Sequence, residues 1–250
     1  MAKKRSSLLS IDAWDSRFFK VNIGRARFSG KRSGHGFSTE LSRLLGEAKA
    51  RRVNFLILKL IHSKRSLENR IRRSGFNDFG EAVDFRFKAR NSKTVLKEMP
   101  FFVRACTPRD MNSVKGIARD AFRLSYLYRV GLGSIREVDR YHATWISNLF
   151  KDKESKVLVA ARNNTVCGFI GVSFDKITRT ARIMLVAVRK GYRGEGVGSM
   201  LIDEVLGQER KRSRALFVKT QSENVSAIAL YKRRGFIAVG REKIFCKRIG

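Results

Sequence analysis

The sequence predicts an α/β protein built from two domains, and three patterns carry this prediction. Short apolar stretches of strand character alternate with stretches whose apolar residues recur every three or four positions, as in helices. The chain has only two prolines, and the stretch around Pro100 separates two sets of such elements. A short sequence also recurs in both sets. We therefore expect one domain at residues 1–98 and another at residues 99–250.

The first domain is expected to contain two helices and two strands. Leu41, Leu44, Leu45 and Ala48 have the spacing of one apolar helix face. The other expected elements are a buried strand at residues 53–61, a short helix at 66–76 that Gly75 ends, and an alternating strand at 82–88.

The second domain is expected to be richer in strands. A helix at 107–122 begins with Thr107 as its N-cap and Pro108 in its first turn. Further helices are expected at 134–150, from 197 to about 208, and at 222–236, where Gly235 ends the helix. Strands are expected at 101–106, 156–162, 165–174, 180–188 and 215–220, with a last strand or hairpin at 237–247.

The recurring sequence is IRRSGF at residues 71–76 and YKRRGF at residues 231–236. Each copy is expected to follow a strand and to precede another strand. The first domain therefore resembles a truncated copy of the last part of the second, which indicates a duplicated scaffold.

Composition limits the class of protein. A chain of 250 residues with 43% hydrophobic residues and 18 Phe can build a large core, so we expect a globular protein. The apolar runs are too short for a signal peptide or a membrane span, which predicts a cytoplasmic protein. The cysteines (Cys106, Cys167 and Cys246) and the three separate histidines do not have the spacing of a metal site, so no metal is expected.

The formal net charge is +32, and the excess is spread along the chain rather than gathered in one block. A solvated basic surface explains this charge without any partner. The functional alternative is attraction of an anionic ligand: a phosphorylated cofactor, a nucleotide-linked substrate, RNA or an anionic membrane. The absence of a long Lys/Arg block makes nucleic acid the less favoured partner.

The stretch VAVRKGYRGEGVGSML, residues 186–201, combines closely spaced glycines with the start of an apolar helix pattern. Glycines allow a ligand to approach the backbone, and the first N–H groups of a helix attract anions. A P-loop would require Lys before Ser199, and a dinucleotide fingerprint would follow the first strand of a βαβ unit. Neither pattern fits, which leaves an empty tight turn or another kind of phosphate site.

RGEGVG within this stretch resembles the Arg-x-x-Gly-x-Gly signature of the GNAT superfamily of N-acetyltransferases. Their second motif matches Asn224 followed by LYKRRGF, residues 230–236, and the resemblance covers about residues 101–250. It implies a mixed, mostly antiparallel central sheet flanked by helices, preceded here by a smaller α/β domain that resembles a truncated half of the same fold. The stretch WDSRFFKVNIGRARF (14–28) and the helix YHATWISNLF (141–150) also resemble the TDP-fucosamine acetyltransferase-like group.

The resemblance implies acetyl-CoA as the acyl donor. Its pyrophosphate would be held by the backbone of the loop, and its pantetheine arm would pair with the strand near Val186 and Val188. The loop residues implied are Arg193, Gly194, Glu195, Gly196, Val197, Gly198 and Ser199. Asn224 would hydrogen-bond the pantetheine or the strand beside it, or it would serve only as a helix N-cap.

Tyr231 is the expected general acid for the leaving thiolate, because it lies two helical turns after Asn224 and a phenol has a suitable pKa of about 10. The alternative is a core aromatic residue. No general base is evident on the strand 180–188, so water or His142 is left, and His142 is more typical of a packed helix residue. The aromatic residues expected to line an acceptor pocket are Tyr126, Tyr128, Tyr141 and Trp145.

We expect acetyl transfer to the amine of a small molecule, with a nucleotide-linked amino sugar favoured and a homodimer possible. One alternative is acetylation of a protein N-terminus or lysine. A third is a basic protein that binds RNA or a membrane surface on a catalytically idle scaffold, and the missing acidic base is its only support.

Overall fold

The computed structural model describes residues 7–31, 34–88 and 100–249. Contacts divide the chain into two compact units, and neither is continuous in sequence. Unit 1 takes residues 1–82, 129–133 and 240–250, and unit 2 takes residues 83–128 and 134–239. The expected boundary at residues 98 and 99 lies outside the described residues. Within the described ranges, no helix combines the length and the apolar character that crossing a membrane requires.

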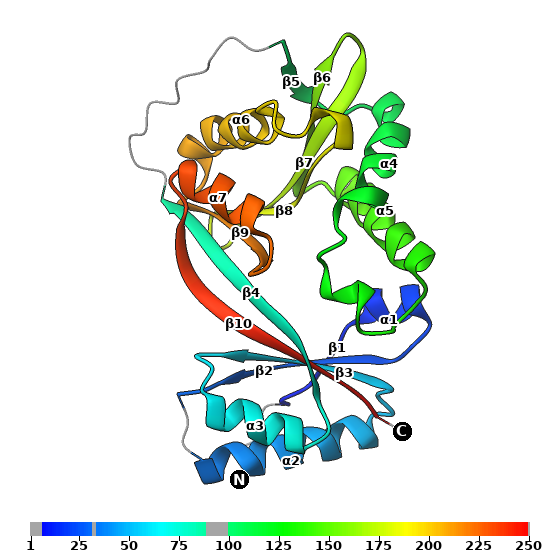
Figure 1. Cartoon of the computed structure of the whole chain (residues 1–250), viewed down its shortest axis with the longest axis vertical. Coiled ribbons are helices and arrows are strands. Elements are labelled where there is room, and N and C mark those ends of the chain that lie inside the picture. The colour runs from blue at the N-terminus through cyan, green and yellow to red at the C-terminus, as the bar shows by residue number, and fades with distance from the viewer. Residues whose placement is uncertain (1–6, 32–33, 89–99, 250) are drawn as a thin grey trace. The chain divides into compact units, whose positions relative to one another are not determined.

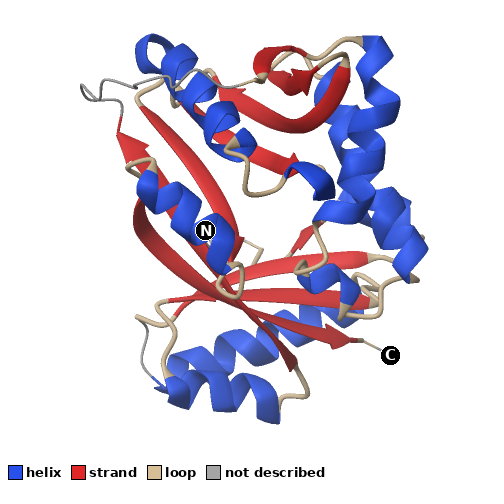
Figure 2. Ribbon diagram, turned by 45° about the horizontal axis from the view of Figure 1, so that its top comes forward, coloured by secondary structure: helices blue, strands red, loops and turns tan. Residues whose placement is uncertain are grey.

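Unit 1 packs two helices on one face of its strands (Figures 1 and 2). Its elements are β1 (Ser10–Ile11), α1 (Ala13–Phe19), β2 (Ile23–Ser29), α2 (Gly34–Ala50), β3 (Phe55–Ile61) and α3 (Arg65–Arg73), with parts of β4 (Asn77–Lys88) and β10 (Ile237–Arg248). The strands lie in the order β1-β2-β3-β10-β4. Strand β3 pairs in parallel with β2 and antiparallel with β10.

Three of the four residues predicted for the apolar face of α2 are confirmed as core, and the fourth, Leu45, is half-buried beside them. Leu41, Leu44 and Ala48 of α2 are buried against Leu56 and Leu58 of β3, in one cluster. The structure adds β1, α1 and β2, which the hydrophobic pattern alone did not assign. Helix α1 starts there because the Asp12 side chain accepts the Asp15 N–H and so caps the helix.

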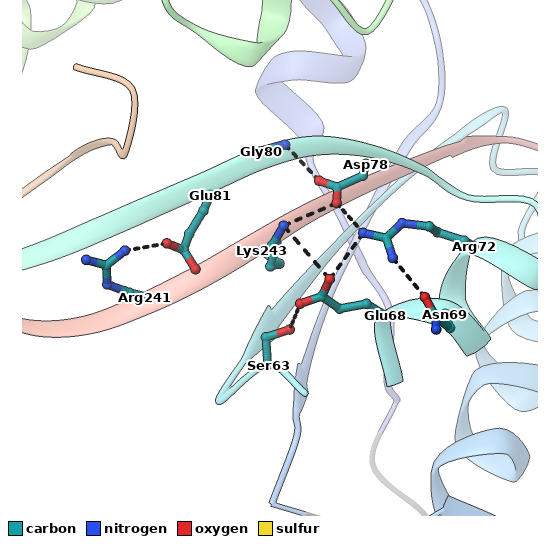
Figure 3. A network of polar contacts seen from close by, with 9 residues as sticks. All are labelled: Ser63, Glu68, Asn69, Arg72, Asp78, Gly80, Glu81, Arg241 and Lys243. Atoms are coloured by element: carbon teal, nitrogen blue, oxygen red, sulfur yellow. Dashed lines mark hydrogen bonds and ion pairs between the residues drawn. The ribbon is translucent and has the colours of Figure 1, made fainter. Parts of the chain in front are cut away.

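A polar network ties α3 to the first residues of β4 and to β10 within unit 1 (Figure 3). Arg72 bridges Glu68 and Asp78 at 3.1 and 2.7 Å, and Lys243 lies 3.3 Å from Asp78. Burial opposes ionisation of Asp78, but the Gly80 N–H, Arg72 and Lys243 together lower its pKa below the ordinary value. The carboxylate therefore stays charged and holds the two cations in place.

Unit 2 contains a mostly antiparallel set of strands with helices on both sides, as the sequence predicted (Figure 1). Its strands are β5 (Phe102–Ala105), β6 (Ser155–Arg162), β7 (Thr165–Asp175), β8 (Thr180–Val188) and β9 (Ala215–Gln221), joined by residues 83–88 of β4. Its α-helices are α4 (Met111–Ala121), α5 (Ile135–Lys151), α6 (Val197–Arg212) and α7 (Val225–Arg233), and short 3₁₀ turns precede α4, α5 and α6. The strand order is β4-β9-β8-β7-β6-β5. Strands β5 to β8 pair antiparallel with their neighbours in this series, whereas β8 and β9 pair in parallel.

Alternate residues of these strands enter two different cores. Ile170 and Ile183 pack with Val197 and Leu201 of α6, whereas Phe169 packs with α4 and α5. Successive side chains of a strand point to opposite faces, so α6 covers one face of the strands and α4 with α5 covers the other. We call these the α6 face and the α5 face.

The recurring six-residue sequence marks equivalent places in the two units. Helices α3 and α7 both have nine residues, both end before a glycine with positive φ (Gly75, +83°; Gly235, +81°), and both lead into a strand of twelve residues. Strand β4 begins in unit 1 and ends in unit 2, and β10 begins in unit 2 and ends in unit 1. Each unit therefore takes part of a long strand that starts in the other.

Because β4 ends in unit 2, we expect Phe85, which precedes the expected domain boundary, to contribute strongly to the stability of unit 2. Phe85 of β4 is 1% exposed and its ring lies 5.8 Å from that of Tyr231 in the core of unit 2. Phe85→Ala is expected to lower the free energy of unfolding by about 3–5 kcal/mol, because it leaves a cavity. Urea unfolding followed by circular dichroism measures this change. Phe102→Ala is the control, since Phe102 is 48% exposed, and an equal effect of both variants would contradict the assignment of β4 to this core.

Candidate active site

The glycine-rich loop leads from β8 into α6, as the sequence predicted. Gly194 and Gly196 both have φ of +85°, a conformation that other residues rarely adopt, and a side chain on Gly194 would meet no atom within 4 Å. Arg193 is exposed and its Nε donates to the carbonyl of Val188 at 3.2 Å. Glu195 is held at 3.2 Å by Arg162. The loop is thus an open turn with a fixed cation beside it.

The N-terminus of α6 has no side-chain cap, because the N-cap residue is Gly196. The first helix hydrogen bond runs from the Met200 N–H to the Gly196 carbonyl at 3.1 Å. The N–H groups of Val197, Gly198 and Ser199 therefore have no helical acceptor. Together with the positive end of the helix dipole, these groups suit an anion such as a phosphate.

Strands β8 and β9 pair along only part of their length. Their register runs from Thr180 opposite Ala215 to Ile183 opposite Val218, although β8 continues to residue 188 and β9 to residue 221. Beyond this last pair, the β8 backbone is not paired with β9. An extended ligand can use such unpaired backbone groups in place of a strand.

A bulge in β8 sets which side chains flank this unpaired segment. Gly171 of β7 faces Leu185 and Val172 faces Ile183, so Met184 is the extra residue. After the bulge, Leu185 lies in the core of the α5 face, while Val186 packs on the core of the α6 face. The predicted residues Val186 and Val188 therefore lie on the same face as the glycine loop.

The loop, the end of β8 and helix α7 converge at one glycine. A Cβ on Gly198 would lie 3.2 Å from Leu230 Cδ2 and 3.7 Å from Val188 Cγ2. A Cβ on Gly168 of β7 would lie 2.9 Å from the carbonyl oxygen of Ala187 and 3.0 Å from Val197 Cγ1. Gly168 therefore allows α6 to approach the strands closely. Gly168 was not among the predicted site residues, although an isolated glycine within a strand is a signal for such an approach.

Tyr231 and Asn224 lie at opposite ends of α7. Tyr231 is 3% exposed, and its ring lies 5.8 Å from those of Phe85 and Phe236. Burial raises the pKa of its phenol well above the ordinary value, which keeps the hydroxyl protonated. Asn224 is the N-cap, and its side-chain oxygen accepts from the Ala227 N–H at 3.2 Å. The capping role weighed for Asn224 is thus present, and its amide nitrogen makes no hydrogen bond to another described residue.

The aromatic residues predicted to line the acceptor pocket contact different neighbours in the structure. Tyr128 donates to Asp139 at 2.7 Å, and burial with this hydrogen bond raises the pKa of its phenol. His142 lies between Phe122 and Tyr128, with ring centroids at 4.9 and 5.9 Å. Its Nδ1 lies 2.9 Å from the Val138 carbonyl oxygen, and it is 2% exposed. His142 is therefore a packed helix residue, which is the role that the sequence favoured over that of a general base.

Tyr141 and Trp145 form an edge-to-face pair at 6.0 Å on α5. Tyr141 is buried and Trp145 is half-buried. Trp145 and Met184 each pack against the core of the α5 face. Tyr126 lies half-buried in a short 3₁₀ turn before α5. Trp145 and the bulge residue of β8 therefore share one face, opposite the glycine loop. In the described part of the chain, no three acidic, His or Cys residues gather as a metal site.

The packing of His142 predicts that it does not titrate near neutral pH. Burial lowers its pKa to about 4, below the value of about 6.5 for an unfolded chain. Its contribution to stability is thus complete above pH 6.5 and is lost as the pH falls toward 4, because the unfolded chain takes up the proton first. NMR of the imidazole, assigned by its loss in His142→Gln, is expected to show no titration between pH 5.5 and 8. A midpoint near 6.5 would contradict this packing.

Comparisons with known proteins agree with this geometry. Residues 118–236 match the model of the acetyltransferase (GNAT) family. The chain is 30% identical over 145 residues to the spore coat polysaccharide biosynthesis protein SpsD of Bacillus subtilis (strain 168), covering 57% of this chain and 49% of that protein. It is 29% identical over 92 residues to streptothricin acetyltransferase of Streptomyces lavendulae, covering 36% of this chain and 49% of that protein. The chain thus spans about half the length of these two relatives.

A solved structure extends the likeness in fold to both units. A tandem GNAT protein from the clavulanic acid biosynthesis pathway matches with a TM-score of 0.57 at 14% identity, over 91% of this chain and 75% of that one. The chain therefore carries, at residues 118–236, a domain of the GNAT acetyltransferase family.

Proposed function

We propose that this protein transfers an acetyl group from acetyl-CoA to the amine of a small molecule, and that the acceptor is a nucleotide-linked amino sugar. One observation carries the donor part of the proposal. The open, uncapped N-terminus of α6 stands beside the segment of β8 whose pairing with β9 has ended. A phosphate site and a free strand edge next to each other suit a ligand with a pyrophosphate and an extended amide-bearing arm.

The residues of the loop fit the donor. The N–H groups from Arg193 to Ser199 would hold the pyrophosphate, and Arg193 would add charge. The backbone at Val186 and Val188 would pair with the pantetheine amides and orient the thioester. Acetyl-CoA supplies an activated acyl group, and a backbone N–H aimed at its carbonyl oxygen would stabilise the charge that develops there.

Proton transfer can be assigned to Tyr231. The phenol is protonated at neutral pH, as a general acid must be, and burial raises its pKa above the ordinary value, which makes it a weaker acid than a free tyrosine. On the attacking side, the amine must lose a proton. Among the described residues of β8 there is no acidic side chain, and His142 is packed away, so we assign this proton to water.

The names of the two curated relatives support a small molecule, rather than a protein, as the acceptor. One is named for polysaccharide biosynthesis and the other for acetylation of streptothricin. The half-buried Trp145 on the α5 face offers an aromatic surface for a sugar or a base. An acetyl-transfer assay against a panel of amines that includes nucleotide-linked amino sugars and peptides decides between acceptor classes.

Gly198→Val is expected to weaken acetyl-CoA binding. The added side chain would lie against Leu230 and Val188, within the space proposed for the donor. Calorimetry is expected to show at least a tenfold higher Kd for acetyl-CoA. Gly207→Val in the same helix is the control, because a Cβ at Gly207 meets no atom within 4 Å. Failure of the wild type to bind acetyl-CoA would refute the proposed function.

Tyr231→Phe is expected to lower kcat about 10²–10⁴-fold while the Kd of acetyl-CoA changes less than about twofold. The substitution keeps the ring that packs on Phe85 and Phe236 and removes only the proton donor. Tyr192→Phe is a matched control, since Tyr192 also packs against a phenylalanine, at 6.2 Å from Phe101. Unchanged turnover in Tyr231→Phe would remove Tyr231 from the reaction.

A further inference from the structure

Three adjacent strands of unit 2 carry a cluster of charged residues around one aromatic ring. Arg182 of β8 and Lys219 of β9 lie 3.1 and 3.0 Å from the carboxylate of Asp84 on β4. The guanidinium groups of Arg182 and Arg86 lie 5.3 and 5.9 Å from the centre of the Phe217 ring. We call these five residues the basic cluster.

The basic cluster lies on the α5 face of the strands. Residues next to its members in sequence, Phe85, Val218 and Ile183, all pack in the core of the α6 face. Alternation along each strand therefore directs the side chains of the cluster to the opposite face. The ion pair from Arg182 to Asp84 crosses β9, which lies between their strands, and confirms that they share this face.

The cations and the aromatic ring are closely grouped in the cluster. Arg182 and Lys219 share the single carboxylate of Asp84, and Arg86 lies over the Phe217 ring. Arg86 Nε is buried and has no hydrogen-bond acceptor among the described residues. A purely structural ion-pair network would satisfy a buried donor of this kind. The shared carboxylate and the unused donor of Arg86 suit an anionic ligand.

The cluster stands at the point where β8 and β9 separate. Arg182 immediately precedes Ile183 and Lys219 immediately follows Val218, the last pair between the two strands. The unpaired segment of β8 begins two residues after Arg182, about 7 Å along the strand, and ends at Val188, about 20 Å from Arg182. The α6 face beside this segment holds the glycine loop, α6 and α7, so we place the acceptor on the face that carries the basic cluster.

We propose that the basic cluster binds the diphosphate of the acceptor, with Phe217 against its base or sugar. Arginine presents several donors in a fixed plane, which suits phosphate oxygens, and the two arginines and the lysine offer donors to more than one phosphate group. That the bound acceptor presents its amine toward β8 rests on the proposed acetyl transfer. That the cluster binds a diphosphate does not depend on that function. The cluster thus selects a phosphorylated acceptor over the same amine without phosphate.

The test uses the full chain saturated with CoA, so that the loop at α6 is filled, and thymidine diphosphate as the probe in calorimetry. Arg182→Gln and Lys219→Gln each remove one cation from a partly exposed position, and each is expected to raise the Kd of the probe at least tenfold. Arg212→Gln is the matched control, because Arg212 also lies over an aromatic ring, 4.1 Å from the centre of Phe174, outside the cluster. It is expected to leave the Kd unchanged.

Absence of probe binding to the wild type, or equal effects of all three substitutions, would overturn the cluster as a diphosphate site. A separate titration with CoA alone distinguishes the two proposals. If CoA does not bind, the proposed function fails, and the probe titration repeated without CoA still decides the cluster. If both ligands bind, Arg182→Gln is expected to leave the Kd of CoA within twofold of wild type.

Discussion

The hydrogen bonding of one strand, β8, is the constraint on which the rest of unit 2 depends. It pairs with β7 up to its last residue but with β9 only as far as Ile183, and the bulge at Met184 changes which face the later side chains take. A straight, fully paired strand would bury its amide groups and leave nothing for a ligand. Early release from β9 combined with continued support from β7 gives a rigid strand with one usable edge, which is what positioning of a reacting group requires.

The two faces of this strand differ in electrostatic character in a way that suits two ligands. On the α6 face the uncapped N–H groups at Val197, Gly198 and Ser199 stand beside the cation of Arg193. On the α5 face the positive charge comes from side chains, Arg182 and Lys219 among them. Backbone donors are fixed by the helix and suit a constant cofactor, whereas side chains can change without loss of the fold and suit a variable acceptor. The two proposed anion sites thus give specific places within a net charge of +32 that is spread along the chain.

The glycine loop, the strand before it and the helix ended by Gly235 could be predicted because each depends on local residue types. The residues of α2 and β3 that enter the core of unit 1 were predictable from apolar spacing alone. The short elements β1, α1 and β2 were not, since α1 depends on a cap from Asp12 and β2 on pairing with β3. The basic cluster was also hidden, because Asp84, Arg182 and Lys219 are far apart in sequence and meet only through the strand order β4-β9-β8. Tyr231 was found by motif, and its burial beside Phe85 required the structure.

The exchange of long strands between the units has a consequence for how the chain is made. A ribosome delivers β3 and α3 early, but the neighbour of β3 on the side away from β2 is β10, whose residues 240–248 follow all of unit 2 in the sequence. Unit 1, although first in sequence, can complete its hydrogen bonding only after unit 2 has been translated. Until then β10 cannot pair with this edge of β3, and an unpaired strand edge is a site at which a nascent chain can pair wrongly.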